Sequence, residues 1–261
     1  MVKAAFIGTA LLLSNFAAAQ CSKPFKLALE QWPPYVYTDA TQQAAGLDIE
    51  LIKMVFAEAG CHLVFVPELP KKRRLAEFMA GHIDVMLAAS DVPERHAYSW
   101  FSQPYRNESV SLFSQSTQSA KYRDVTQFSQ ILQRKITLLS PSSGWYGEDY
   151  KKHYDALMQA QLISTFESFG QGMKMLSAKR AELIMGDTAA VVFEAKKQNI
   201  ALIALSNVIL SEPVHLMLSK KSVTEDDLNQ INAALERLEL RGTLKTIRTQ
   251  YGLPAKVSTQ K

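Results

Sequence analysis

The chain has 261 residues, of which 47% are hydrophobic and 21% are charged. These values are ordinary for a soluble globular protein, and the length is sufficient for a sizeable core divided between two lobes. The formal net charge of +4 is small and spread along the chain, which argues against a nucleic-acid-binding function. The only dense basic cluster, residues 71–74, is typical of a solvated helix face.

Residues 1–19 have the pattern of a secretory signal peptide. Lys3 supplies the positive start, residues 4–13 form an apolar segment, and three alanines at 17–19 provide small residues for cleavage. The apolar segment is too short to span a bilayer. We therefore expect a soluble mature protein that is exported to the periplasm.

Strand and helix patterns alternate along the mature chain. Short apolar runs predict strands, and apolar residues at helical spacing predict helices. This order predicts an α/β fold with parallel sheets and right-handed crossovers. The first series consists of strand 25–29, a helix from Leu47 to Gly60, strand 62–66, a helix over 75–80 that ends at Gly81, and strand 85–89.

A second series follows strand 109–114, which we interpret as the segment that leaves the first lobe, and the polar stretch 114–119. Strand 214–218 should return the chain to the first lobe, where the last two helices would pack. Ligand-facing loops are expected at the carboxyl ends of the strands. The predicted elements of this half are strand 135–139, a turn over 140–144, helix 174–178, strands 183–185 and 214–218, and helices 224–240 and 243–250.

The two cysteines each precede a predicted strand. Cys21 lies before strand 25–29, and Cys61 lies before strand 62–66. If these strands are parallel neighbours, both thiols lie at the same end of the sheet and within bridging distance. An exported protein meets an oxidising compartment, so we expect a disulfide, with two separate buried thiols as the alternative. Either role is structural.

Strand 85–89 ends at Ser90 and Asp91, and Pro93 then suits the first position of a helix. A strand that leads into a helix directs free backbone N–H groups and the positive end of the helix dipole to one place. Arg95 would add a planar fork of donors that suits a carboxylate. The pattern predicts a small anion-binding corner; the alternative for Arg95 is a solvated or salt-bridged surface position.

Six short motifs follow one another in a fixed order. They are Gly46-Leu47-Asp48-Ile49-Glu50-Leu51 and the segments 81–85, 90–95, 102–105, 180–187 and 240–245. Together they resemble the bacterial extracellular solute-binding proteins of family 3, which serve amino-acid ABC transporters. The resemblance covers almost all of the mature chain.

The resemblance implies a two-lobed periplasmic binding protein fold of type II. Each lobe would be a mostly parallel sheet flanked by helices, and two chain segments would form the hinge between the lobes. We expect lobe 1 to comprise residues 22–113 and 212–254, and lobe 2 to comprise residues 114–211. Ligand should bind between the lobes and stabilise the closed form.

The resemblance also implies a set of ligand-binding residues. Arg95, helped by Ser90, would hold an α-carboxylate, and Asp187 would hold an α-ammonium from the opposite lobe. A zwitterion needs one fixed cation and one fixed anion, so that neither charge is left unpaired when the cleft closes. Asp187 also suits a helix N-cap, which is compatible with ligand binding.

Further candidates surround this set. Trp32 would lie against the ligand side chain or act as a lid over the core, and Glu30 would pair with a cationic ligand. Ser142 and Ser143 occupy the position of a loop that donates hydrogen bonds to ligand. Lys71 takes the place of a ligand-stacking aromatic residue and brings positive charge to the mouth of the cleft.

Other departures from the family pattern leave the ligand open. Val92 replaces a threonine that contacts the carboxylate, and Pro141 replaces a glycine. Together with Lys71, these changes allow an acidic ligand or one that is not an α-amino acid.

We therefore interpret the chain as a monomeric binding protein that captures a small polar solute, foremost an amino acid, and delivers it to an inner-membrane ABC permease. The five histidines are isolated in sequence, and the chain has no nucleophile elbow or phosphate-binding loop, so we expect no metal, cofactor, nucleic acid or catalysis. The alternatives are a cyclohexadienyl-dehydratase-like enzyme on the same fold and a ligand-presenting sensor subunit.

Overall fold

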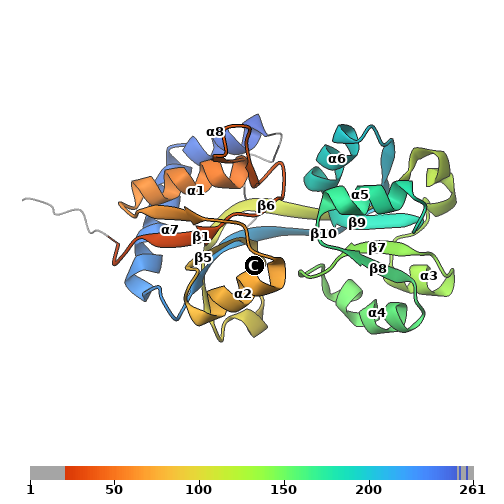
Figure 1. Ribbon diagram of the computed structural model, residues 1–261, viewed down its shortest axis with the longest axis horizontal. Coiled ribbons are helices and arrows are strands. Elements are labelled where there is room, and N and C mark those ends of the chain that lie inside the picture. The colour runs from red at the N-terminus through yellow and green to blue at the C-terminus, as the bar shows by residue number, and fades with distance from the viewer. Residues whose placement is uncertain (1–20, 252, 254–256, 258–261) are drawn as a thin grey trace, which may run out of the picture.

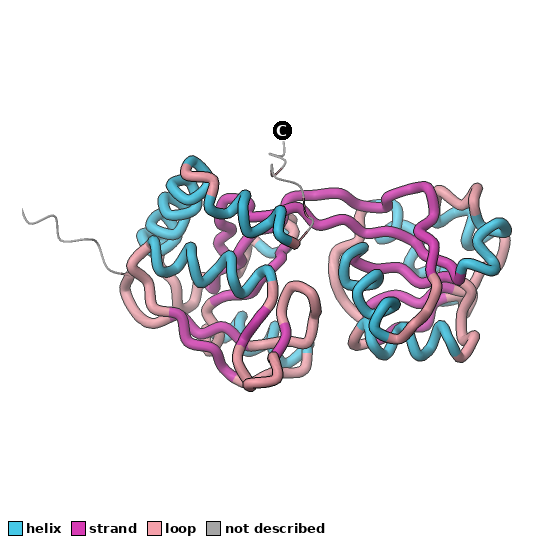
Figure 2. Tube along the Cα trace, turned by 90° about the horizontal axis from the view of Figure 1, so that it is seen from above, coloured by secondary structure: helices cyan, strands magenta, loops and turns pink. Residues whose placement is uncertain are grey.

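Two lobes lie side by side along the long axis of the molecule and are joined by two long strands (Figures 1 and 2). The computed structural model describes residues 21–251, 253 and 257. The predicted signal peptide, residues 1–19, therefore lies outside the described residues. In this part of the chain we find no helix with the length and hydropathy that a bilayer crossing requires.

The strands of both lobes belong to one eight-stranded sheet with the order β4-β1-β5-β10-β6-β9-β7-β8, and β2 and β3 form a separate ribbon. Pairs β1–β4, β1–β5, β7–β8 and β7–β9 are parallel, as expected for each lobe. The strand bounds are β1 (Phe25–Ala28), β2 (Tyr37–Thr38), β3 (Ala44–Ala45), β4 (Leu63–Val66), β5 (Val85–Ala89), β6 (Ser99–Gln115), β7 (Leu138–Pro141), β8 (Ile163–Phe166), β9 (Leu183–Asp187) and β10 (Leu202–Ser219).

Helices cover both faces of the sheet in each lobe (Figure 1). One lobe carries the first two and last two helices, and the other carries the middle four. The bounds are α1 (Leu47–Glu58), α2 (Lys71–Ala80), α3 (Phe128–Gln133), α4 (Glu148–Gln159), α5 (Phe169–Ser177), α6 (Thr188–Lys197), α7 (Glu225–Leu240) and α8 (Thr243–Gln250), with 3-10 turns η1 (Pro93–Arg95) and η2 (Ser116–Tyr122).

The antiparallel strands β6 and β10 run through both lobes (Figure 2). The sequence predicted only their ends, residues 109–114 and 214–218, because Pro104 and the polar residues around it break the apolar pattern. In one lobe β10 pairs with β5, and in the other β6 pairs with β9. Register shifts along the β6–β10 pair, including one between Val214 and His215, interrupt an otherwise continuous ladder.

Each lobe has its own core, and Ala190 of α6, in the second lobe, packs with the first. The first contains Phe25, Leu47 and Ile231, which join β1, α1 and α7. Two further clusters, one around Leu138 and one around Ile184, fill the other lobe and draw their buried residues from 110–210. Helix α1 follows the predicted spacing, since the buried Leu47, Leu51 and Val55 share one face.

Several local predictions were wrong. Helix α2 begins at Lys71, four residues before the predicted start, because Pro70 stands at its N-cap and only Arg74 and Phe78 are buried. The predicted strand 135–139 lies instead at Leu138–Pro141. Pro141, which was predicted inside the turn, is therefore the last residue of the strand. The polar stretch after residue 114 forms η2, which the buried Tyr122 anchors. No sequence pattern predicted β2, β3, β8, α3 or α4, and α6 was indicated only by its N-cap at Asp187.

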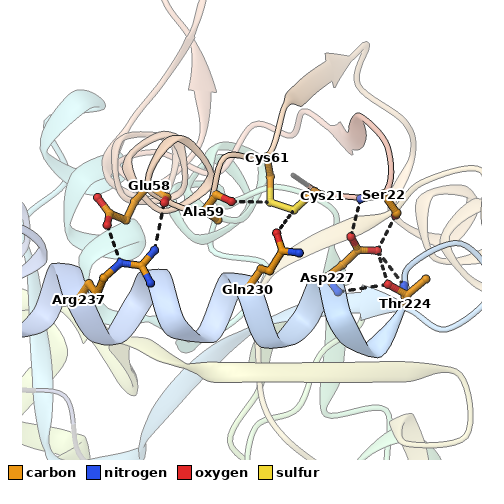
Figure 3. The surroundings of a disulfide bond; sticks show 9 residues. All are labelled: Cys21, Ser22, Glu58, Ala59, Cys61, Thr224, Asp227, Gln230 and Arg237. Atoms are coloured by element: carbon orange, nitrogen blue, oxygen red, sulfur yellow. Dashed lines mark hydrogen bonds and ion pairs between the residues drawn. A yellow bond between two sulfur atoms is a disulfide. The ribbon is translucent and has the colours of Figure 1, made fainter. Parts of the chain in front are cut away.

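The predicted disulfide is confirmed, and it joins Cys21 to Cys61 with their Cα atoms 5.0 Å apart. Strands β1 and β4 are parallel neighbours, with Phe25 opposite Leu63, so both cysteines precede the same end of the sheet. Helix α7 lies beside the bridge (Figure 3), where Asp227 accepts hydrogen bonds of 2.8 and 2.7 Å from the backbone N–H and hydroxyl of Ser22. The bridge and Asp227 together fix the start of β1 to the rest of its lobe.

Candidate functional site

Described side chains of the two lobes contact each other directly, through the packing of Ala190 against the first lobe's core and through polar contacts, of which three follow. The Tyr35 hydroxyl, on the loop after β1, donates to Oδ2 of Asp187 at the end of β9 over 3.2 Å. Lys71 Nζ, at the start of α2, donates to the carbonyl of Ser143 over 2.5 Å. The third contact is an exposed ion pair between α4 and η1, in which Lys151 Nζ lies 3.0 Å from Oε1 of Glu94, and such exposed pairs contribute little stability.

A fully buried ion pair lies beneath the first contact. Arg106 Nε is 2.6 Å from Oδ1 of Asp48, and Arg106 Nη2 is 3.0 Å from its Oδ2. Tyr105 donates a further hydrogen bond to Oδ2 over 3.0 Å. Neither side chain of the ion pair is exposed to solvent. The charge of Arg106 is thus matched by Asp48, which lies in the first turn of α1.

Aromatic rings stack against this ion pair. The guanidinium carbon of Arg106 lies 3.9 Å from the centre of the Tyr35 ring and 5.3 Å from that of Trp32. The indole of Trp32 packs against the first lobe's core, and its buried Nε1 has no hydrogen-bond partner. The position of Trp32 agrees with the lid interpretation; its contact with ligand stays a prediction.

Asp187 is 2% exposed and forms the N-cap of α6, where Oδ1 accepts from the N–H of Ala190 over 2.8 Å. Burial raises the pKa of this carboxyl to about 6, although the charge of Arg106 and the hydrogen bonds from Ala190 and Tyr35 lower it. The N-cap role proposed from the sequence is therefore present. A carboxylate with this pKa is largely ionised at neutral pH.

Glu108 is a second carboxyl in the same region, and no sequence motif indicated it. Burial and the charge of Asp187 raise its pKa to about 8, although the charge of Arg106 lowers it. The predicted strand began at residue 109, so Glu108 was left outside any element. Its alternation with Arg106 along an extended segment was the signal that could have placed both residues on one face of the sheet.

Arg95 lies at the end of η1 and is partly buried. Its Nη1 donates to the carbonyl of Ser90 over 3.0 Å. The expected helix is absent here, because η1 is one 3-10 turn of three residues before β6 begins. The prediction that a helix N-terminus forms the anion corner was therefore wrong. Val92, at the N-cap, has no side-chain acceptor, and Asp91 instead contacts His96 Nε2 at 2.5 Å.

Lys71 and Glu30 come together in the structure with Arg74. Glu30 Oε2 is 2.6 Å from Nη2 of Arg74, which is 6% exposed, so Glu30 already has a cation. Burial lowers the pKa of Lys71, and the charge of Glu30 counteracts this effect. Ser143 accepts from Lys71 through its carbonyl, whereas the N–H of Ser142 donates to the carbonyl of Phe166 over 2.9 Å.

Tyr146 lies beside the Lys71–Ser143 contact, and its pKa is influenced by the charges of Glu108, Asp187 and Arg95. Its hydroxyl donates to the carbonyl of Ser143 over 2.9 Å, beside Lys71. Burial raises the pKa of Tyr146, the charges of Glu108 and Asp187 raise it further, and the charge of Arg95 lowers it. We refer to Lys71, Arg95, Glu108, Tyr146 and Asp187 as the interlobe cluster. It contains two cations from one lobe and two carboxyls that have no basic ion-pair partner among the described residues.

A groove of about 640 Å³ opens between the lobes, and no residue of the interlobe cluster lines it. None of the predicted ligand residues lines it, although Gln31 and Pro33 on either side of Trp32 do. Among the described residues, no group of three or more His, Cys, Asp or Glu side chains could hold a metal ion. The groove is lined by Gln31, Pro33, Ser168, Phe169, Gly170, Gln171, Lys174, Glu194, Lys197 and Gln198.

Residues 26–254 match the family model of the bacterial extracellular solute-binding proteins, family 3. The chain belongs to this family. A comparison with curated protein sequences finds no match. The role of a solute-binding protein, which the sequence motifs indicated, is therefore established at the level of the family.

Solved structures with the same fold include both binding proteins and relatives with other roles. An amino-acid ABC transporter substrate-binding protein from Streptococcus pneumoniae, bound to L-arginine, is 17% identical with a TM-score of 0.70, over 88% of this chain and 95% of that chain. An ancestral amino-acid-binding protein described as a precursor of cyclohexadienyl dehydratase is 20% identical with a TM-score of 0.69, over 87% and 94%. A histidine kinase sensor domain is 14% identical with a TM-score of 0.73, over 89% and 96%. At these identities the likeness shows the type II periplasmic binding protein fold.

The Asp48→Ala substitution should lower the free energy of unfolding by about 3–5 kcal/mol, because Arg106 is then buried without an anion. Chemical denaturation would measure the loss. Asp155→Ala, on the exposed face of α4, is the control and should change stability by less than about 0.5 kcal/mol. Replacing both partners, as in Asp48→Leu with Arg106→Met, should recover part of the loss; a cost below about 1 kcal/mol for Asp48→Ala alone would contradict a structural role for the pair.

Proposed function

We propose that this protein binds a zwitterionic small solute, an amino acid, between its lobes and delivers it to an ABC permease. Arg95 holds the α-carboxylate, and Asp187 holds the α-ammonium from the opposite lobe. The observation that carries this proposal is the position of Asp187, a buried carboxyl that has no basic ion-pair partner among the described residues and contacts the other lobe through Tyr35.

The remaining predicted residues have supporting roles in this proposal. Ser90 holds Arg95 through its carbonyl, and Trp32 closes the lobe-1 side against Tyr35, with ring centres 4.7 Å apart. Ser142 and Ser143 supply the opposite loop. Lys71 crosses to that loop, and Glu30 keeps Arg74 in place beneath it.

We also propose that the lobes are residues 22–113 with 212–254, and 114–211, and that they move about β6 and β10. Ligand that touches both lobes would favour the closed arrangement by population shift. The mature protein would act as a monomer in the periplasm after removal of residues 1–19. Support for this arrangement comes from the separate cores and from the register shifts along the strand pair.

One observation favours a second candidate, an enzyme that acts on an anionic cyclohexadienyl substrate. Such an elimination needs a general acid in the closed cleft, and a Glu108 carboxyl with a pKa of about 8 retains its proton at neutral pH. Lys71 and Arg95 would then bind the substrate carboxylates. This candidate predicts turnover of prephenate.

A thermal-shift screen of the mature protein against L-amino acids, small dicarboxylates and prephenate tests the two candidates. A ligand at about a thousand times its dissociation constant adds roughly 4 kcal/mol of stability, which raises Tm by about 8–16 °C at this size. We expect such a shift with one class of amino acid. No shift with any amino acid, or product formation from prephenate, would contradict the binding proposal.

The Arg95→Ala substitution should weaken binding of the identified amino acid by about 2–5 kcal/mol, because the buried carboxylate loses its cation. Titration calorimetry would measure the affinity, and the melting temperature would show that the fold is retained. Lys72→Ala, on the exposed face of α2, is the matched control and should leave affinity unchanged. Unchanged affinity in Arg95→Ala would remove the α-carboxylate assignment.

Affinity should fall as pH decreases through about 6, because a protonated Asp187 no longer attracts the ligand ammonium. The decrease approaches tenfold per pH unit well below this pKa. Dissociation constants between pH 7 and pH 4.5 would measure it. In Asp187→Asn, binding should be weaker and this pH dependence absent; an unchanged profile in that variant would assign the titration to another group.

A further inference from the structure

The β6 register places Glu108 on the same face of the sheet as the interlobe contacts. Between Arg106 and Val110 the pairing with β10 is regular, so Arg106, Glu108 and Val110 share one face. Val110 lies opposite Asp187 on β9. Glu108 is therefore diagonal to Asp187 on the neighbouring strand, at a Cα separation of about 7–8 Å typical of such positions.

The side-chain carboxyl of Glu108 accepts no hydrogen bond from a described residue and forms no ion pair with one. The nearest cation on its own strand, Arg106, donates through Nε and Nη2 to Asp48 and through Nη1 to the carbonyl of Asn107. Lys71 donates to the carbonyl of Ser143. Two adjacent carboxyls in a partly buried position are costly to ionise together unless a cation joins them.

Charged and titratable groups face Glu108 from every surrounding element, and they do not supply that cation. Carboxyls come from β9 and α1, and Glu212 on β10 is its direct cross-strand partner. Lys71 from α2 and Arg106 from β6 supply positive charge, but both have other acceptors. Tyr146, from the loop before α4, adds a phenol. In the free protein the Glu108 carboxyl is largely protonated at neutral pH, since its pKa is raised to about 8.

We propose that Glu108 binds a positively charged group on the ligand side chain, and that the solute is therefore a basic α-amino acid. This inference rests on the proposed function, in which Arg95 and Asp187 already hold the α-carboxylate and α-ammonium. The diagonal spacing of Asp187 and Glu108 suits a ligand whose two cationic groups are separated by an aliphatic chain. Glu108 is then a specificity-determining residue.

The test compares L-arginine with L-citrulline, which has nearly the same shape but an uncharged end group. Titration calorimetry at pH 7 would be carried out on the wild type, Glu108→Gln and the control Glu236→Gln, which changes an exposed residue of α7. We expect the wild type and the control to bind arginine at least tenfold more tightly than citrulline. In Glu108→Gln this preference should disappear, with citrulline affinity nearly unchanged.

A second readout follows the proton. When arginine displaces the proton of Glu108, close to one proton should be released at pH 7, which titrations in two buffers of different ionisation enthalpy would detect. Glu108→Gln should release far less. The affinity for arginine should also rise between pH 7 and pH 8.5 in the wild type and stay level in the variant.

The outcomes separate this inference from the proposed function. If Glu108→Gln keeps the preference for arginine, or loses arginine and citrulline alike with an unchanged melting temperature, the assignment of Glu108 is wrong. Arg95→Ala would still weaken both ligands if the proposed function is right. A wild type that binds neutral amino acids but neither arginine nor citrulline overturns this inference alone, and a wild type that binds no amino acid overturns both.

Discussion

The interlobe surface depends on the buried ion pair between Arg106 and Asp48. A guanidinium inside the protein requires an anion at hydrogen-bond distance, and the two bonds from Arg106 to Asp48 meet that requirement. Because this charge is matched, Arg106 can support the ring of Tyr35 without neutralising the carboxyls nearby. Asp187 and Glu108 thus have no basic ion-pair partner among the described residues.

Much of the fold could be predicted because its signals are local. The run Val85–Ala89, the spacing within Leu47–Glu58 and the placement of Cys21 and Cys61 each reflect short-range patterns. The long strands could not be predicted in full, since Pro104 and the register shifts interrupt the pattern in sequence but are accommodated by pairing partners that are distant in sequence. Tertiary pairing decided those strands.

The residues of the candidate site likewise differ in whether a local sequence signal indicates them. Arg95 and Asp187 were proposed from motifs, and Asp187 caps α6 as its sequence context indicated. The helix expected after Pro93 did not form, since the chain enters β6 four residues after Arg95. Glu108 has no motif, and its neighbour Asp187 is almost eighty positions away in sequence. Only the β6–β9 register brings the two together.

The shared sheet also affects the order in which the chain can fold. The second lobe's cores use one uninterrupted segment, so they can form before the rest of the chain has folded. The first lobe has to wait, because β10 is paired with β5, and α7 lies beside the disulfide at the start of β1. These distant contacts give it a high contact order, so its closure should be the slower step, with the edge of β5 open to wrong partners until then.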